Sequence, residues 1–270
     1  MFNLGFHGSH NATIAISSGE KILEVVELER FLSEKNAALF YWGDPPNLQL
    51  ILEEIQDYFV RKYGADSYDR LIYNSVDLEK WDPKTVFPVN HVQHMPHHEA
   101  HCYSALYQSP YQTAIVISFD GGSDEGFFNL YLASKGHTAK KLYSGVKDYA
   151  ISYMTPAHFI REIRREPNIY RGNLVYAGKL MGFVGFGEYR EDLAERLISF
   201  YQSNTYDRIP DAVDRFVDHF SDFGIESWDS YFNEQDGRDI ATTNQVVFER
   251  LFREEVFAEG FLPEVFQQLP

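Results

Sequence analysis

Residues 2–28, FNLGFHGSHNATIAISSGEKILEVVEL, contain three short apolar runs separated by turns. The runs lie at 2–6, 12–17 and 21–28, the last two are rich in β-branched residues, and glycine, serine and asparagine lie between the runs. This pattern predicts three consecutive strands joined by tight turns. The first turn, from Gly5 to Asn11, holds two histidines and an asparagine. An ordinary β-meander is the alternative, but it gives no reason for these three polar residues in so short a turn.

Strand–turn–strand–turn–strand is the opening of a ribonuclease-H-like domain, which is the building block of actin-like proteins. Proteins of that superfamily hold phosphate with backbone N–H groups of the first hairpin. Gly8, Ser9 and Asn11 of this hairpin are therefore predicted to bind substrate phosphate. A second unit of the same kind is predicted to begin near residue 112. The expected fold is α/β, with a first actin-like domain at 1–111 and a second, with a helical insertion, at 112–270.

A histidine cluster follows, since five of the ten histidines lie between His91 and His101. A helix that starts at Pro96, where the missing N–H costs nothing, places His97 and His101 one turn apart on one face. Two imidazoles at this spacing can bind one divalent metal. The alternative for an isolated pair of this kind is a solvated helix face.

Asp120 is the predicted third ligand. The run 113–119 is apolar and β-branched, which predicts a buried strand, and Asp120 follows it directly. Gly121 and Gly122 come next and allow backbone to approach a ligand closely. Carboxylates in this position are typical of metal or phosphate sites, although an aspartate before two glycines also forms turns. The sequence therefore predicts a centre for iron(II) or zinc, between which the ligand types do not decide.

The composition argues against several classes of protein. The 40 acidic and 24 basic residues give a net charge of −16, which repels nucleic acid. The single cysteine, Cys102, excludes an internal disulfide, fits a reducing cytoplasm and is expected to be a buried apolar residue. A soluble, cytoplasmic protein is expected, because no signal peptide or membrane span is evident. One basic patch leaves room for a small anion: Arg161, Arg164, Arg165 and Arg171.

Apolar residues at helical spacing predict helices at 48–63, 173–183, 191–200, 209–220 and 239–257. Further strands are predicted at 70–73, 127–133 and 140–144. Gly178 and Gly182, which are four residues apart, allow close backbone packing or the approach of a ligand, and packing is the preferred interpretation. The chain ends without a strand that would complete the second unit, so this domain is expected to be incomplete.

These motifs, in this order, resemble the O-carbamoyltransferases of the nodulation-factor and antibiotic-tailoring type, which are related to the tRNA threonylcarbamoyladenosine synthase. The resemblance spans nearly the whole chain. Three positions depart from the family pattern, namely Asn11, Ser123 and Gly185. The matching residues are Gly5 with His10-Asn11-Ala12-Thr13, Glu29-Arg30-Phe31 with Lys35, His97-His98-Glu99-Ala100-His101, Asp120-Gly121-Gly122, Gly178-Lys179-Leu180-Met181-Gly182, and Asp239-Ile240-Ala241 with Gln245.

The resemblance implies that His97, His101 and Asp120 hold a catalytic iron or a similar metal such as zinc. It also implies that His10 and Lys35 are catalytic. Substrate or phosphate contacts are implied for Gly121, Gly122 and Lys179. The implied reaction transfers a carbamoyl group from carbamoyl phosphate, through a carbamoyladenylate made with ATP, to a hydroxyl acceptor in a biosynthetic pathway.

In the relatives, an adenosine-binding motif, a further aspartate ligand and an adenylate-forming domain follow the helix that matches 239–257. The resemblance therefore implies that a C-terminal half or a second chain completes the enzyme. A homo-oligomer is the other partner considered, and neither nucleic acid nor membrane is expected. The alternative function is a non-catalytic module of the same fold that binds metal and phosphate and acts as a partner or regulator.

Overall fold

The computed structural model describes residues 1–9, 11–33, 37, 48–75, 82–120, 127–145, 147–164, 169–203 and 209–257. The chain divides into two compact units, Met1–Ala100 and His101–Pro270. Each unit is an α/β or helical assembly with its own core. The assignment of actin-like domains to 1–111 and 112–270 stays a prediction.

The first unit contains a five-stranded sheet in the order β3-β2-β1-β4-β5. The first three strands are antiparallel neighbours, whereas β1, β4 and β5 run parallel to one another. This mixed order is that of a ribonuclease-H-like sheet, so the predicted α/β fold class is confirmed. The strands are β1 (Phe2–His7), β2 (Thr13–Ser18), β3 (Lys21–Glu27), β4 (Tyr68–Asn74) and β5 (Val89–His94).

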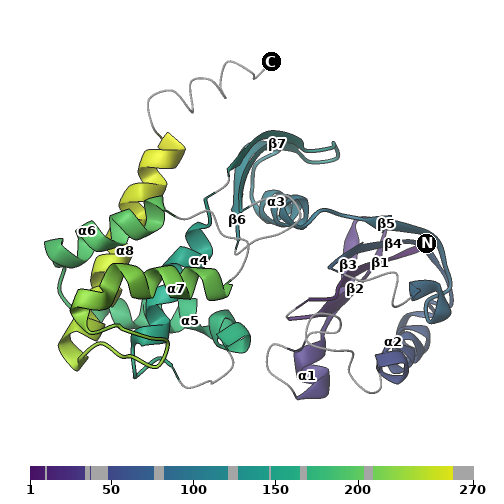
Figure 1. Cartoon of the computed structure of the whole chain (residues 1–270). Helices are drawn as coiled ribbons and strands as arrows, with labels where there is room; N and C mark the ends of the chain where they lie inside the picture. The colour runs from purple at the N-terminus through teal and green to yellow at the C-terminus, as the bar shows by residue number, and fades with distance from the viewer. Residues whose placement is uncertain are drawn as a thin grey trace. The chain divides into compact units, whose positions relative to one another are not determined.

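Helix α2 (Leu48–Tyr63) lies along one face of this sheet, as Figure 1 shows. Its side chains at Leu52, Ile55 and Phe59 are almost fully buried against Leu4 and Ile16 of the sheet. Burial of such apolar side chains contributes about 1.5–3 kcal/mol each. Three elements of this unit have no counterpart among the elements predicted from sequence: β5, the short helix α1 (Leu28–Leu32) and the 3-10 turn η1 (Pro83–Thr85).

The second unit begins within helix α3 (His97–Gln108) and contains a three-stranded antiparallel sheet. Its strands are β6 (Thr113–Phe119), β7 (Phe128–Ser134) and β8 (Lys140–Gly145). Cys102 and Leu106 of α3 pack against Val116 and Tyr131 on one face of this sheet. Cys102 is fully buried, which confirms its expected role as a small apolar residue.

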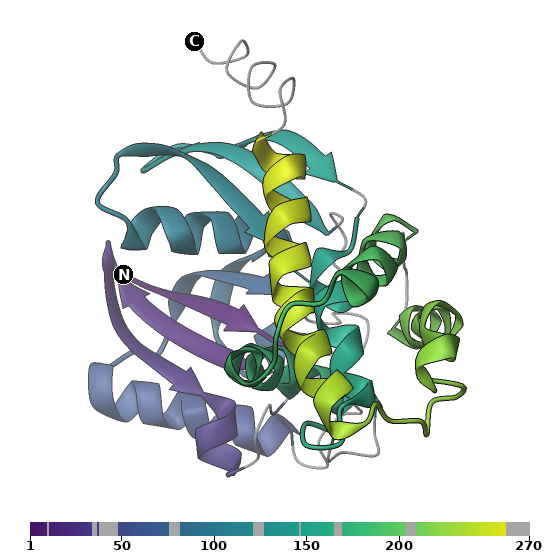
Figure 2. The same ribbon diagram turned by 90° about the vertical axis from the view of Figure 1, so that its left-hand side faces the viewer.

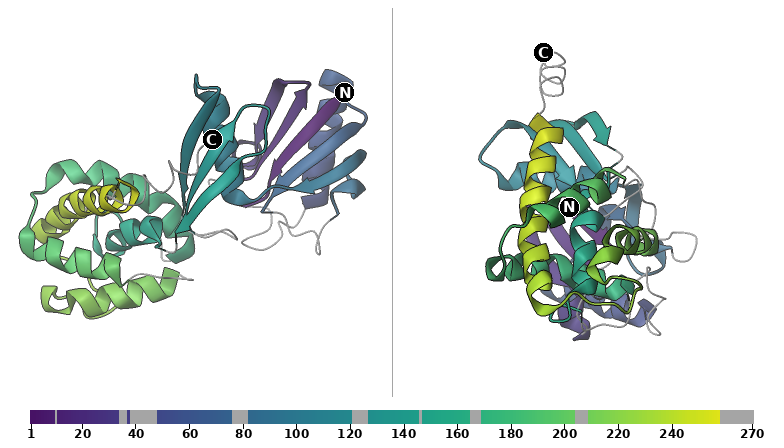
Figure 3. Two further views of the ribbon diagram at one scale, coloured as in Figure 1. Left: turned by 90° about the horizontal axis from the view of Figure 1, so that it is seen from above. Right: turned by 60° about the vertical axis from the view of Figure 1, so that its left-hand side comes forward.

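The rest of the second unit is helical, as the sequence predicts (Figure 3). Its core is rich in phenylalanine, with the Phe216 ring stacked on Phe159 and Phe220 at centroid distances of 5.0 and 4.2 Å. The elements are α4 (Tyr149–Met154), η2 (Thr155–Phe159), α5 (Ile169–Phe183), η3 (Val184–Phe186), α6 (Glu191–Gln202), α7 (Ile209–Phe220), η4 (Ser221–Phe223) and α8 (Glu234–Phe257).

Helix α8 connects the helices of the second unit to its sheet, and Figure 2 shows it running past α6 to the strands. The Phe252 ring lies 5.2 Å from Phe119 and 5.8 Å from Phe128, measured between centroids. Helices α3 and α8 therefore cover opposite faces of the sheet. Among the residues that the structure describes, none of the helices is long and apolar enough to cross a membrane.

Two glycines do not have the packing role expected of them. A Cβ atom built on Gly178 or on Gly182 meets no neighbour within 4 Å among the described residues, so the close packing predicted there is wrong. The alternative interpretation, that a ligand approaches these glycines, stays a prediction. Close packing instead occurs at Gly187, where a Cβ would lie 2.1 Å from the backbone oxygen of Arg238. The next N–H, that of Glu188, donates to Asp239 Oδ1 at 2.9 Å, which holds this turn against α8.

Candidate metal centre

Helix α3 carries both histidines of the predicted centre, so helix geometry sets the relative position of their side chains. The helix starts at His97, directly after Pro96, and its first bond runs from the Ala100 N–H to the Pro96 carbonyl at 3.0 Å. His97 and His101 are one turn apart, and the imidazole of His101 is about half exposed, at 52%. The proline start that the sequence predicts is therefore present.

Asp120 meets these histidines from the end of β6. Its N–H donates to the Phe127 carbonyl at 3.1 Å, which extends the β6–β7 ladder by one residue and fixes the backbone of Asp120. His101 Nε2 lies 3.3 Å from Asp120 Oδ2. One ligand atom from each of His97, His101 and Asp120 lies within 4.8 Å of the others. Two imidazoles and a carboxylate at this separation fit a divalent ion that keeps open positions for other ligands.

His7 lies next to His97, although the sequence analysis assigned it no role. Strands β1 and β4 are parallel and place His7 opposite Asn74 at their carboxyl ends. His7 Nδ1 is 2.6 Å from Asn74 Oδ1, which also accepts from Ser75 Oγ at 2.9 Å. Because an amide oxygen only accepts, His7 Nδ1 carries the proton and Nε2 holds a lone pair in the neutral ring. The His7 ring centroid is 6.2 Å from that of His97.

A second carboxylate, Asp148, lies within electrostatic range of Asp120. It precedes helix α4, is only 1% exposed, and accepts a hydrogen bond from the Ile151 N–H at 2.8 Å. Burial, with a further contribution from the negative charge of Asp120, raises the pKa of Asp148 to about 7. No feature of the local sequence marks Asp148, because aspartate before a helix is a common capping residue.

The predicted phosphate hairpin is described at three positions. Gly8 and Ser9 are buried, and the Gly8 N–H donates to the Asn74 carbonyl at 3.1 Å. Asn11 is exposed and has a left-handed backbone with φ of 57°. The predicted site residues His10, Lys35, Gly121 and Gly122 lie outside the described residues.

Two positively charged regions of the second unit already contact other groups of the protein. Lys179 is exposed on α5, and its Nζ donates to the Ile163 carbonyl at 3.4 Å. Of the predicted basic patch, Arg161 and Arg164 lie over the Tyr231 ring at 5.3 and 5.5 Å. These contacts are cation–π interactions, and they hold the two guanidinium groups beside the same aromatic ring.

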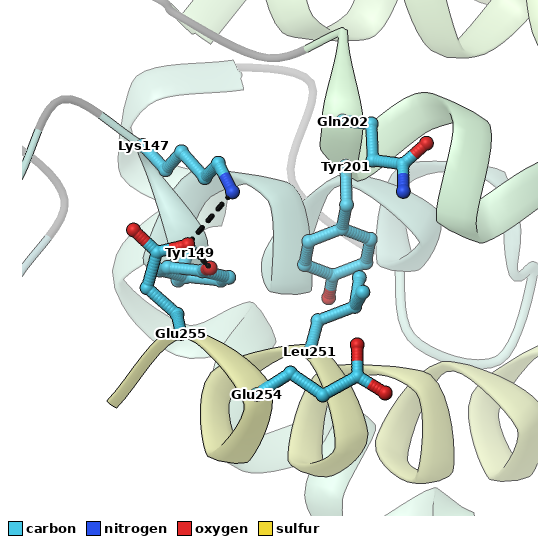
Figure 4. A pocket seen from close by; sticks show the side chains of 7 residues that line it. All are labelled: Lys147, Tyr149, Tyr201, Gln202, Leu251, Glu254 and Glu255. Atoms are coloured by element: carbon cyan, nitrogen blue, oxygen red, sulfur yellow. Dashed lines mark hydrogen bonds and ion pairs between the residues drawn. The ribbon is translucent and has the colours of Figure 1, made fainter. Parts of the chain in front are cut away.

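A pocket of about 260 Å³ opens in the second unit, between α8, α6 and the segment before α4 (Figure 4). Two of its charged groups pair with each other, since Lys147 Nζ lies 2.8 Å from Glu255 Oε2, and the Tyr149 hydroxyl donates to the same oxygen at 3.4 Å. None of the predicted site residues that the structure describes lines it. The lining residues are Lys147, Tyr149, Tyr201, Gln202, Leu251, Glu254 and Glu255.

The chain has distant structural similarity to phosphatases of Aquifex aeolicus. A type II variant of the Ppx/GppA phosphatase is 12% identical, with 95% of this chain and 92% of that chain covered and a TM-score of 0.35. A second structure of the PPX-GPPA enzyme is 13% identical, with 95% and 93% covered and a TM-score of 0.36. Similarity at this level gives no information on the chemistry of the chain.

No curated protein sequence matches the chain. The sequence model of the carbamoyltransferase N-terminus, however, matches residues 51–265. The matched segment contains the histidine helix, β6 with Asp120 and the helices of the second unit. Because the match covers most of the chain, the chain belongs to the family of carbamoyltransferase N-terminal domains.

Proposed function

We propose that this chain carries out metal-dependent transfer of a carbamoyl group from a carbamoyladenylate to a hydroxyl acceptor, with carbamoyl phosphate and ATP as the source of the adenylate. Membership of the family supports carbamoyl transfer in general. The observation that carries the finer proposal is the convergence of His97, His101 and Asp120, whose ligand atoms lie within 4.8 Å of one another.

The proposed reaction has three balanced steps. Water cleaves carbamoyl phosphate into carbamate and phosphate, and the carbamate oxygen then attacks the α-phosphorus of ATP with loss of pyrophosphate. The acceptor oxygen finally attacks the carbamoyl carbon, and AMP leaves. A divalent metal, when bound, supplies a Lewis acid that polarises phosphate or acyl oxygen. Iron(II) is the proposed ion, and zinc is the alternative.

The proposed roles of the protein residues concern charge and proton position. His10 is the proposed base for the acceptor hydroxyl proton, and Lys35 offsets charge on phosphate or on the carbamoyl oxygen. The backbone of Ser9, Asn11, Gly121 and Gly122 supplies N–H donors to phosphate, and Lys179 adds a positive charge. Gly8 donates its own N–H to the Asn74 carbonyl, and its proposed part is to let phosphate approach the backbone closely. The hydrogen bond to Asn74 orients the His7 ring beside His97 and fixes its tautomer.

The test uses protein loaded with iron(II) under anaerobic conditions, ¹⁴C-labelled carbamoyl phosphate, ATP and a panel of sugars, polyols and phenols. We expect label to appear on an acceptor together with an equal amount of AMP. The assay is repeated with the C-terminal domain of a family member, because relatives carry an adenylate-forming domain there. His101→Ala should lose transfer, whereas the exposed histidine control His91→Ala should retain it.

Metal binding without AMP formation or label transfer, with and without the added domain, would contradict the proposal. In that case the chain would be a module that binds metal and phosphate and acts as a partner or regulator. We further propose a cytoplasmic, biosynthetic role. The single cysteine is the observation that favours a reducing compartment.

A further inference from the structure

Three buried polar atoms of the second unit have no hydrogen-bond partner among the described residues. They are both amide atoms of Asn129 and Oδ2 of Asp148. Asn129 is fully buried and Asp148 is 1% exposed. Native proteins rarely leave buried polar groups unsatisfied, and such groups commonly mark bound water or a bound ion.

Asn129 faces the same side of the sheet as Asp120. It lies on β7 directly opposite Ser118 of β6, and Ser118 comes two residues before Asp120. Side chains alternate along a strand and match across an antiparallel pair, so Ser118, Asn129 and Asp120 share one face. Cys102 and Leu106 of α3 pack on this same face, and His101 is the neighbour of Cys102. The Asn129 amide therefore lies on the face of the sheet that α3 covers, which is also the face of Asp120.

One carboxylate oxygen of Asp148 accepts a hydrogen bond, and the other has no hydrogen-bond partner among the described residues. The Ile151 N–H bonds to Oδ1 at 2.8 Å, whereas Oδ2 is buried and meets no donor among the described residues. The charge of Asp120 acts on this carboxylate and, after burial itself, helps to raise its pKa. The negative charge of the partly exposed Asp120 disfavours ionisation of the buried Asp148, and a cation near both carboxylates would offset this repulsion.

We propose that Asp148 and Asn129 form the outer shell of the metal centre, where they hydrogen-bond to water carried by a divalent cation on His97, His101 and Asp120. The inference rests on the metal centre of the proposed function and extends it to two residues outside the ligand set. Water on the cation supplies the donor that Asp148 Oδ2 needs, and it offers the Asn129 amide a polar partner. Removal of an outer-shell partner weakens metal binding by roughly 10- to 100-fold.

The experiment measures the Kd for cobalt(II), an oxygen-stable divalent probe, by competition with a fluorescent chelator. Asp148→Asn keeps an oxygen for the Ile151 N–H but removes the charge, and Asn129→Leu replaces the amide with an apolar group of similar size. Both variants should raise the Kd roughly 10-fold or more. The Tm of the metal-free Asp148→Asn variant should not fall, because a buried charge is removed.

Asp82→Asn is the matched control, because Asp82 also accepts a backbone N–H bond at the start of a helical turn, where it is exposed. Its Kd should equal that of the wild type. A Kd that stays unchanged in both Asp148→Asn and Asn129→Leu, while His101→Ala abolishes binding, overturns this inference alone. If the wild type itself binds no cobalt(II), the metal centre of the proposed function fails together with the inference.

Discussion

Replacement of Asp148 by asparagine should change how the stability of the metal-free protein depends on pH. The pKa of Asp148 is about 7 in the folded chain against an ordinary value of 3.8, and burial is the main cause. Between these two values the folded protein holds a proton that the unfolded chain has released. The free energy of unfolding therefore falls as the pH rises, and the contribution of Asp148 to stability is lost as the pH passes through about 7.

The size of the effect follows from the difference between the two pKa values, which is about three pH units. Each unit corresponds to about 1.4 kcal/mol, so the ionised Asp148 costs on the order of 4 kcal/mol above pH 7. About half of this penalty develops between pH 5 and pH 8. Asp148→Asn removes the titration, and we expect its advantage over the wild type to grow by roughly 2–3 kcal/mol across that interval.

The assay is urea unfolding of metal-free protein at several pH values between about 5 and 8. Trp42→Phe and Trp81→Phe in both proteins leave Trp228 as the only tryptophan, so its fluorescence reports the second unit. Asp148→Ala serves as the comparison, since it also loses the bond to Ile151 and should be about 1 kcal/mol less stable than Asp148→Asn. A difference between variant and wild type that stays constant with pH, or a less stable Asp148→Asn at pH 8, would refute the reasoning.

Three further predictions concern the metal centre and the helical core. After anaerobic loading with iron(II), elemental analysis should find iron in the wild type and none in His97→Ala/His101→Ala. A doubly substituted protein that retains its iron would exclude the centre. Gly178→Ala should stabilise α5 by up to about 1 kcal/mol, whereas Gly187→Ala should lower the Tm because its Cβ meets the Arg238 backbone. Equal changes in Tm at the two positions would contradict this difference. Phe216→Ala should lower the free energy of unfolding by about 3–5 kcal/mol, and the exposed control Phe31→Ala should change it by less than about 0.5 kcal/mol in chemical denaturation.

Local sequence pattern predicted most of the regular structure. Helix α7 is found at Ile209–Phe220, the residues over which it was predicted, and β6 is likewise found at Thr113–Phe119. Both segments have a clear hydrophobic period, which needs no knowledge of the partner element. Strand β5 was missed because Val89–His94 contains only two apolar residues and is held by parallel pairing with β4.

The ligand set of the candidate centre could also be proposed from the sequence, because a four-residue spacing on one helix and a carboxylate at a strand end are local features. His97, His101 and Asp120 lie close together, while their role as metal ligands stays a prediction. The predicted chemistry of His10 and Lys35 lies outside the described residues. The resemblance to carbamoyltransferases agrees with the family match.

The surroundings of that centre depend on contacts between distant segments. His7 meets Asn74 through the register of β1 with β4, and Asn129 lies opposite Ser118 through the register of β7 with β6. Asp148 is influenced by Asp120, 28 residues earlier in the chain, because the fold buries Asp148 within electrostatic range of the partly exposed Asp120. The sequence by itself determined the fold class and pointed to three proposed ligands, since periodicity and spacing are local, and the resemblance of its motifs indicated the family. Only the tertiary structure decided which buried polar groups surround them, because strand register and burial depend on residues far apart in the chain.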